Sequence, residues 1–571
     1  MKKFILLSVL LAVNGTLLAN NWEGTVNHFW GTAANWSDGT VPTAGDQAYI
    51  PPGTPNDCWV SWQDQECNIL TIASGASLRI YDQVLTINSY IVTQGHLVMD
   101  HNAGELRVAG SFYWYSGSSA AITAGSSEIY VGGDWYFNSG CTAQLANGYV
   151  EFNGTGSSSI YSRSPDAGFH HLRCNKQGGT LVVNPTSTAD LQVGGNLYYY
   201  TGSTFSYNSN YALIMGGSLN NQGGDAYLIA GELVYNGGSH TLQLDGDNYL
   251  YHLRLDATGT TQLQSPLDIR GNLNIDNGLL MAAGYDIEIA GNWNDNVGNG
   301  FVAGGNQVTF SGNVNNHLSS EEFHDLLVDK SGGTLTIDIG ATLDVTGVVT
   351  LDQGTVHLSN SCQLQSAGQL SIAAGATLDA AGSWGVALAV GGNWLDENTL
   401  APGFTAGTST VTFFGSDQWQ YISSPDLSSY TFHNLIIDKD FGCVINSSDD
   451  FLFTGDFEVI TGCWSSPYYT AGVEHTFRGD LSIAADGGFI DENLLRFDTS
   501  SDQQLLKEAG ASCTIGTIQV DKPTGTLQLA AEILNIWRLE VDQGSCNLNG
   551  ARLWVDYHVI VNSGGILQLD A

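Results

Sequence analysis

Apolar and polar residues alternate along most of the chain. After a glycine that recurs throughout the sequence, apolar residues fall two and four positions on, at Leu273 and Ile275 and again at Leu481 and Ile483, and the positions between are polar. This period of two is typical of β-strands with one buried face. The sequence therefore predicts many short strands, and it contains no convincing amphipathic helix.

The strands belong to a repeat of three parts, which return in the same order. The first part is an apolar residue, any residue, glycine and a small polar residue, followed by a strand. The second part is a short strand that ends in an aromatic residue, and the third often reads Phe-His-x-Leu. Copies of the first part begin at Val108, Val131, Val193, Ile269, Ile289, Val390, Phe453 and Phe477.

Neighbouring copies are separated by about the length of one solenoid coil. The step is 20 residues from Ile269 to Ile289 and 24 residues from Phe453 to Phe477. We therefore predict an all-β fold, a parallel β-solenoid (β-helix) with coils of about 20–24 residues. The alternative is a series of tandem β-sandwich repeats with antiparallel strands. The lack of linkers rich in Pro, Gly and Ser between repeats favours the solenoid.

The N-terminus has the features of an export signal. A positive stretch, Met1-Lys2-Lys3, precedes about ten apolar residues, which are too few to span a bilayer, and Ala19 offers a cleavage site. The sequence thus divides into a signal peptide at 1–19, an N-terminal opening or capping segment at 20–68, and a β-solenoid repeat region at 69–571 without a C-terminal cap. We expect a secreted protein or one on the outer cell surface.

The charge balance excludes several classes of partner. The chain has 56 Asp and Glu residues against 17 Lys and Arg residues, a formal net charge of −39. Nucleic acid binding needs a basic stripe, and an anionic membrane surface repels an acidic chain, so neither partner is expected. No membrane span is expected after removal of the signal. Acidic chains outside the cell can carry calcium, but the sequence identifies no specific site and no other cofactor.

Histidines and lysines recur with the third part of the repeat. His170, His324 and His433 occupy one repeat position several coils apart, so they cannot share a metal ion within a chain. Four of the five lysines beyond residue 18 follow this part of the repeat, at Lys176, Lys330, Lys439 and Lys522. We therefore predict no metal site and interpret these lysines as turn residues of the fold.

The nine cysteines leave at least one unpaired, because their number is odd. Cys58 and Cys67 are close in an exported chain and are flanked by turn-like residues, which favours a disulfide between them. Cys443 and Cys463 lie 20 residues apart, about one coil, so they are candidates for neighbours on adjacent strands. Their sequence contexts differ, and we rank this second pair below the first.

The opening of the chain after residue 28 resembles that of a known group of proteins. It reads Phe29-Trp-Gly-Thr-Ala-Ala-Asn-Trp-Ser-Asp-Gly-Thr-Val-Pro-Thr-Ala-Gly-Asp46 and leads into Ala48-Tyr-Ile50. The group consists of secreted β-helix repeat proteins of Gram-negative bacteria, surface or adhesin-like proteins associated with type IX secretion. The later Phe-His-x-Leu and Gly-Asn-Trp copies are similar to the same group. The resemblance covers most of the chain and implies a cell-surface or released protein.

The C-terminal end departs from that group, whose members usually finish with a compact sorting domain that this sequence lacks. The residues 562–571 repeat an internal pattern, Gly375-Ala-Thr-Leu-Asp-Ala380, which elsewhere continues into the next coil. A solenoid that stops there exposes unpaired backbone groups. We expect either a fragment of a longer protein or self-association at this edge.

A carbohydrate-active β-helix enzyme is the alternative function, because parallel β-helices also carry polysaccharide lyases and glycoside hydrolases. Hydrolysis requires two carboxylates about 5 to 9.5 Å apart. Acidic pairs occur at Asp245 and Asp247, at Asp396 and Glu397, and at Asp449 and Asp450. With 56 acidic residues such pairs arise by chance, and no Ser/His/Asp or Cys/His motif is evident. No catalytic residue is predicted.

Three copies of the first part carry aromatic runs, at 112–115, 135–137 and 197–200. The alternation predicts that Phe112, Trp114, Trp135, Phe137, Leu197 and Tyr199 point inward. It places five tyrosines outward as candidate ligand-binding residues, Tyr113, Tyr115, Tyr136, Tyr198 and Tyr200. An exposed aromatic face can hold glycans or surface proteins. The leading hypothesis is therefore an exported structural or adhesive cell-surface protein.

Overall fold

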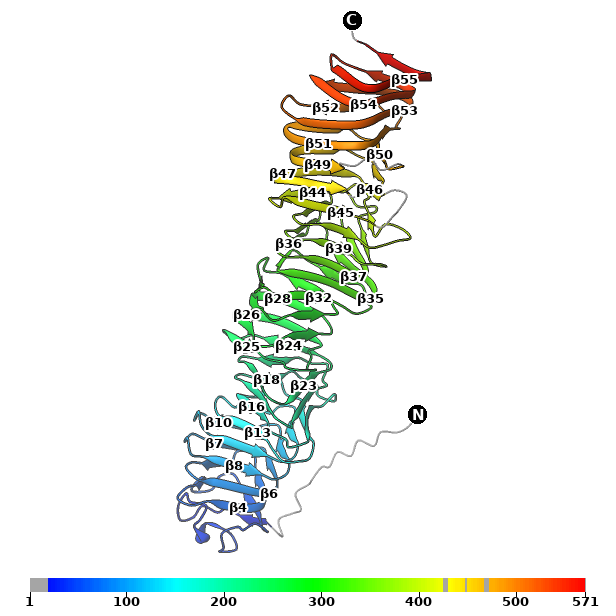
Figure 1. Ribbon diagram of the computed structural model, residues 1–571. Coiled ribbons are helices and arrows are strands. Elements are labelled where there is room, and N and C mark those ends of the chain that lie inside the picture. Colours follow the sequence, from blue (N-terminus) through cyan, green and yellow to red (C-terminus); the bar gives the residue numbers. More distant parts are fainter. Residues whose placement is uncertain (1–18, 425–429, 447–448, 467–471, 570–571) are drawn as a thin grey trace, which may run out of the picture. The chain divides into compact units, whose positions relative to one another are not determined.

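The predicted parallel β-solenoid is confirmed by the computed structural model, which describes residues 19–424, 430–446, 449–466 and 472–569. Strands make up 59% of the chain and stack in parallel as about 23 turns (Figure 1). Parallel pairing excludes the alternative of antiparallel β-sandwich repeats. The predicted signal peptide, 1–19, lies outside the described residues except for Ala19. The chain divides into two compact units, 1–268 and 269–571.

Unit 1 is a three-sided solenoid, because each coil contributes one strand to each of three parallel ladders. The first ladder contains β4 (Gln65–Ile72), β6 (Val84–Thr93), β8 (Glu105–Val108), β11 (Glu128–Val131), β13 (Tyr149–Phe152), β16 (His171–Cys174), β19 (Leu197–Tyr200), β22 (Leu219–Gln222), β25 (His240–Leu242) and β26 (His252–Leu263). The second contains β1 (Ala19–Asn21), β2 (Gln47–Ile50), the later residues of β4 and β6, β9 (Phe112–Trp114), β12 (Trp135–Phe137), β14 (Ser158–Ser162), β17 (Thr180–Val183), β20 (Thr204–Tyr207) and β23 (Asp225–Leu228). The third contains β3 (Cys58–Val60), β5 (Ser77–Ile80), β7 (His96–Met99), β10 (Ser119–Ile122), β15 (Gly168–Phe169), β18 (Leu191–Val193), β21 (Leu213–Met215), β24 (Glu232–Tyr235) and the first residues of β26.

The parallel ladders begin inside the segment that we expected to form an N-terminal opening, 20–68. Strand β1 pairs with β2, and β2 pairs with β4. A 3-10 turn, η1 (Ala33–Asn35), lies between β1 and β2. Trp30 and Trp36 are buried beside it with ring centroids 4.8 Å apart. Trp30 and Trp36 thus pack against each other inside the first coils of unit 1.

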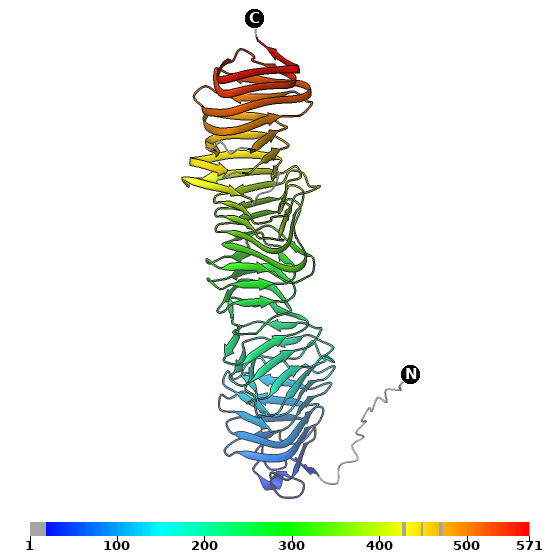
Figure 2. The same cartoon turned by 45° about the vertical axis from the view of Figure 1, so that its right-hand side comes forward.

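Unit 2 is built in the same way, and Figure 2 shows its strands stacked one on the next. The division between the units falls within β27 (Leu267–Ile269). The strands that follow are β28 (Leu273–Met281), β29 (Ile287–Ile289), β30 (Trp293–Asp295), β31 (Phe301–Val302), β32 (Gln307–Phe310), β33 (Asn316–Leu318), β34 (Glu321–Phe323), β35 (Asp325–Ile337), β36 (Thr342–Val345), β37 (Val349–Leu358), β38 (Gln363–Ser366), β39 (Leu370–Ile372), β40 (Thr377–Asp379), β41 (Ala387–Val390), β42 (Trp394–Asp396), β43 (Phe404–Thr405), β44 (Thr410–Gly415), β45 (Trp419–Ser423), β46 (Tyr430–Phe432), β47 (Asn434–Asn446), β48 (Phe451–Phe453), β49 (Phe457–Ser466), β50 (Glu474–Phe477), β51 (Leu481–Phe497), β52 (Gln503–Lys507), β53 (Ser512–Ala531), β54 (Ile533–Asn547) and β55 (Arg552–Gln568).

The inward positions follow the predicted alternation. The six residues expected inside are all buried, namely Phe112, Trp114, Trp135, Phe137, Leu197 and Tyr199. The register confirms the coil length, since Val108 pairs with Val131 and Phe453 pairs with Phe477 on the next coil. The recurring glycine allows the coils to stack closely. A Cβ atom on Gly133 would lie 2.6 Å from the carbonyl carbon of Gly110.

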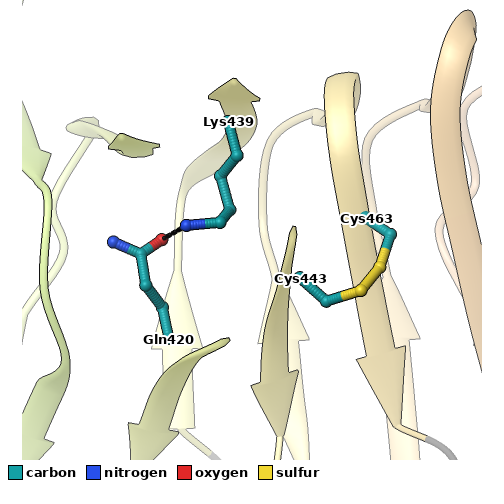
Figure 3. The surroundings of a disulfide bond; sticks show 4 residues. All are labelled: Gln420, Lys439, Cys443 and Cys463. Carbon is teal, nitrogen blue, oxygen red and sulfur yellow. Dashed lines mark hydrogen bonds between the residues drawn. A yellow bond between two sulfur atoms is a disulfide. The ribbon is translucent and has the colours of Figure 1, made fainter. Parts of the chain in front are cut away.

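The four recurring lysines lie inside the solenoid, which corrects their interpretation as turn residues. Lys176, Lys330, Lys439 and Lys522 are buried, and burial lowers the pKa of each amine. Their Nζ atoms donate hydrogen bonds to Ser158 Oγ, Asn316 Oδ1, Gln420 Oε1 and Gln503 Oε1, respectively. Figure 3 shows the bond from Lys439 to Gln420, which is 2.6 Å long. Polar partners are needed here because an isolated buried ammonium group is costly.

One disulfide forms, and it is the pair that we ranked second. Cys443 on β47 and Cys463 on β49 are register partners with Cα atoms 4.3 Å apart (Figure 3). Cys58 and Cys67 are both buried free thiols, so the disulfide predicted between them is wrong. They are separated by less than half a coil, which places Cys58 on the third ladder and Cys67 on the first.

Candidate binding surface

The five candidate tyrosines lie on two different sides of unit 1. Tyr113 on β9 and Tyr136 on β12 are register partners in the second ladder. Tyr115 directly follows β9 and is exposed. Tyr198 and Tyr200 belong to β19 in the first ladder. All five point outward, but the structure brings only the first three together.

Tyr113 and Tyr136 form a stack with Tyr161 on β14, a residue that the sequence reading missed. The ring centroids are 4.6 Å apart between Tyr113 and Tyr136 and 4.3 Å apart between Tyr136 and Tyr161, with interplanar angles of 13° and 4°. The nearly parallel rings cover one another's faces, so the stack presents mainly ring edges to solvent. A sugar that stacks on aromatic faces therefore finds little room between these three rings.

Tyr136 is further fixed by a carboxylate. Its hydroxyl donates to Asp134 Oδ2 at 3.2 Å. Burial first, and the nearby charge of Asp134 second, raise the pKa of Tyr136 above its ordinary value. Ring stacking and this hydrogen bond together fix Tyr136 on the outer face of the second ladder.

Charged and aromatic side chains share the outer face of the first ladder. Arg107, Tyr130, Glu151, Arg173 and Tyr198 are successive register partners there. Arg173 Nη1 lies 3.0 Å from Glu128 Oε1 and 3.7 Å from Glu151 Oε2. The Arg173 guanidinium carbon lies 3.7 Å from the centre of the Tyr149 ring. The two carboxylates balance the positive charge of the Arg173 guanidinium, and the Tyr149 ring packs against it.

His171 continues this surface as a neutral group. Burial, as the main cause, and the neighbouring His170 and Arg173 together lower the pKa of His171 to about 4. Its ring stacks on Tyr149 with centroids 4.6 Å apart. At neutral pH the histidine therefore adds an aromatic face without adding charge.

A hollow of about 400 Å³ opens at the corner between the first and second ladders. It is lined by Thr86, Arg107, Val108, Ala109, Tyr130 and Asn153. Gly132 lies between Ala109 and Asn153 in the stack of coils, and a Cβ atom on it would lie 2.3 Å from the carbonyl oxygen of Ala109, so this glycine lets the coils stack closely beside the hollow. The Arg107 guanidinium pairs with Glu105, and the Tyr130 hydroxyl donates to Glu128. Guanidinium, phenol and amide groups thus converge on one concave site, and its volume is within the range of ligand pockets.

The acidic pairs noted in the sequence serve mostly structural roles. Asp396 is buried and accepts hydrogen bonds from the backbone N–H of Gly403 at 2.6 Å and from the Tyr430 hydroxyl at 3.1 Å. Asp449 is buried and accepts a bond from the backbone N–H of Ser424 at 3.1 Å. Asp245 and Asp247 lie exposed at a turn. None of these pairs faces the hollow.

Within the ranges that the structure describes, no set of three or more His, Cys, Asp or Glu side chains is arranged to hold a metal ion. Over the same ranges, no helix has the length and apolar character needed to cross a membrane. No protein-family model, curated protein or solved structure matches the chain.

Proposed function

We propose that this protein is an exported structural or adhesive cell-surface protein whose unit 1 binds a glycan in the hollow between Arg107 and Tyr130. The observation that carries the proposal is the hollow itself, whose lining includes the polar residues Arg107, Tyr130 and Asn153. The apolar signal-like N-terminus and the resemblance to secreted β-helix repeat proteins support export and a surface location.

The chemistry of the hollow suits a hydroxyl-rich ligand. Sugars present hydroxyl groups that exchange hydrogen bonds with guanidinium, carboxylate and amide groups, and their apolar faces pack on aromatic rings. Arg107 is already paired with Glu105, so the site does not require a strongly anionic ligand. Tyr130 and Asn153 supply the ring and the amide on the two neighbouring coils.

The test is glycan-array binding of the variant R107Q/Y130S against plant and microbial glycans. We expect at least a tenfold weaker signal for the glycan that the unchanged protein binds best, because both the guanidinium group and the aromatic ring are lost. The matched control is Tyr211→Ser, which removes another exposed tyrosine of unit 1 whose hydrogen bonds are made by its backbone carbonyl and N–H. A folded R107Q/Y130S protein that binds as well as the unchanged protein would contradict the proposal.

A carbohydrate-active enzyme is the second candidate, because Glu105 and Glu128 are register partners beside the hollow. Adjacent strands are about 4.8 Å apart, so the two carboxylates are close enough for acid–base chemistry. Both are engaged, Glu105 with Arg107 and Glu128 with Tyr130 and Arg173, which favours binding over turnover. If the unchanged protein releases reducing sugars from a polysaccharide and Glu128→Gln does not, the enzymatic function replaces the adhesive one.

A further inference from the structure

Three exposed aromatic side chains of unit 2 differ from the tyrosine stack in leaving their ring faces open. Trp419 and Tyr421 lie on the outer side of β45 with 46% and 43% of their surface exposed, and Phe441 in β47 is 62% exposed. Among the residues that the structure describes, none of these three rings stacks on another ring. The described rings do not cover their faces, in contrast to those of Tyr113, Tyr136 and Tyr161, so part of each exposed ring can meet a ligand.

The strand under Trp419 and Tyr421 is fixed from inside. Gln420 lies between them and points inward. Its Oε1 accepts a hydrogen bond from Lys439 Nζ at 2.6 Å, and its Nε2 donates one to the carbonyl oxygen of Phe414 at 3.0 Å. Figure 3 shows the bond between Lys439 and Gln420 together with the Cys443–Cys463 disulfide. Trp419 is the register partner of Cys443, so the disulfide lies in the same row one coil on. The aromatic side chains thus rise from a preorganised floor, which reduces the entropy cost of binding.

The charge around these rings limits the class of ligand. Asp417, Asp438 and Asp440 are exposed beside them, and the neighbouring Lys439 is buried. The whole chain carries a formal charge of −39, so nucleic acid or an anionic polysaccharide is repelled. A neutral polysaccharide is not repelled, and its pyranose rings offer apolar faces that pack on aromatic rings.

The spacing also fits a linear chain of sugars. Residues two apart in a strand are about 6.8 Å apart, and neighbouring coils are about 4.8 Å apart. The surface that contains Trp419, Tyr421 and Phe441 is therefore wide enough for several sugar rings. We propose that Trp419, Tyr421 and Phe441 form a second carbohydrate-binding surface, which takes a neutral polysaccharide chain and is separate from the hollow of unit 1.

The test is depletion binding of the full chain to insoluble cellulose and to chitin, with soluble polygalacturonate as the anionic probe. We expect the unchanged protein to bind at least one of the neutral polymers and to bind it at least tenfold more weakly after W419A/Y421A. Trp419→Phe keeps an aromatic face and should keep most of the binding. Trp384→Ala is the matched control, because Trp384 is 64% exposed in the same unit and the hydrogen bonds at this residue are made by its backbone.

Three results would overturn the proposal. They are undiminished binding by a folded W419A/Y421A protein, absence of binding to both neutral polymers by the unchanged protein, and stronger binding to polygalacturonate than to either polymer. The variant R107Q/Y130S serves to separate the two sites. If it loses array binding but keeps cellulose or chitin binding, both sites stand, and if only W419A/Y421A has an effect, the hollow of unit 1 fails while this surface stands.

Discussion

At the scale of single residues, buried carboxyl groups of unit 2 are held by indole N–H groups. Trp293 Nε1 donates to Glu321 Oε2 at 2.9 Å, and Trp464 Nε1 donates to Asp491 Oδ2 at 3.0 Å. Asp491 Oδ2 also lies 2.7 Å from His475 Nδ1, and both side chains are fully buried. Burial is the largest cause that raises the pKa of Glu321 to about 7, although the bond from Trp293 opposes it. Glu321 therefore titrates near neutral pH.

Replacing Glu321 by glutamine is predicted to stabilise the protein at pH 8 and to change little at pH 4.5. Between the ordinary glutamate pKa and 7, the folded state binds more protons than the unfolded state. The protonated Glu321 therefore contributes its full stabilisation below the ordinary glutamate pKa, and this contribution is lost as the pH rises through 7. The loss in the unchanged protein is about 3 kcal/mol. Urea midpoints at the two pH values measure it.

The adjacent Glu322 provides the control for this titration. Glu322 is exposed, so Glu322→Gln should shift neither midpoint appreciably. Equal destabilisation of Glu321→Gln at both pH values would show that the carboxyl group serves packing and does not titrate as described.

The sequence predicts which residues point inward where alternation is regular, but it misses the buried lysines. Phe112 and Trp135 follow a clear period of two. Lysine is mostly found on protein surfaces and is rarely buried without a partner, so the burial of Lys439 is not expected from its residue type. Its partner Gln420 comes seven residues after Phe413, and Gln503 comes six residues after Phe497. Only the fold shows that this polar residue and the later lysine meet inside the coil.

At the scale of elements, coil length decides which residues meet. Cys443 and Cys463 are one coil apart, so parallel pairing of β47 with β49 places them side by side. Tyr161 joins Tyr113 and Tyr136 for the same reason, since β9, β12 and β14 are consecutive strands of the second ladder. Tyr198 is not part of that stack, because β19 pairs with β16 and β22 in the first ladder. The sequence repeat predicts the coil, but not where each corner falls.

Removal of the disulfide is predicted to destabilise unit 2. The bond closes a loop of 20 residues, and the loss of this constraint on the unfolded chain costs about 3 kcal/mol. Urea unfolding of C443S/C463S, followed by tryptophan fluorescence, should show a lower midpoint than the unchanged protein. A reducing agent should lower the midpoint of the unchanged protein and leave that of the variant where it is. A variant as stable as the oxidised protein would contradict the prediction.

At the scale of the whole molecule, regular stacking repeats surface charge as well as core residues. Glu105 and Glu128 are register partners, and the chain has 56 acidic against 17 basic residues. Composition and period predict the solenoid and its acidic surface. They do not predict the hollow beside Arg107 and Tyr130 or the exposure of Trp419, because both depend on how individual side chains lie in an otherwise regular row.

Salt is therefore predicted to stabilise the protein. The Debye length falls from about 30 Å at 0.01 M to about 8 Å at 0.15 M salt, which screens repulsion between exposed carboxylates. The thermal midpoint measured by circular dichroism should rise by several degrees between these two NaCl concentrations at pH 7. An unchanged or lower midpoint would show that ion pairs such as that of Arg173 with Glu128 outweigh the repulsion.

The burial of the four recurring lysines affects how readily a protease can cut the folded chain. A protease that cuts after lysine must draw that side chain into its own specificity pocket, and four of the five lysines beyond residue 18 keep theirs inside a stacked coil. Cleavage at these sites has to wait until a coil opens and releases the amine from its partner, for example Gln420 or Gln503. The bonds that tie one coil to the next therefore also keep four of these lysine side chains away from a protease while the coils stay closed.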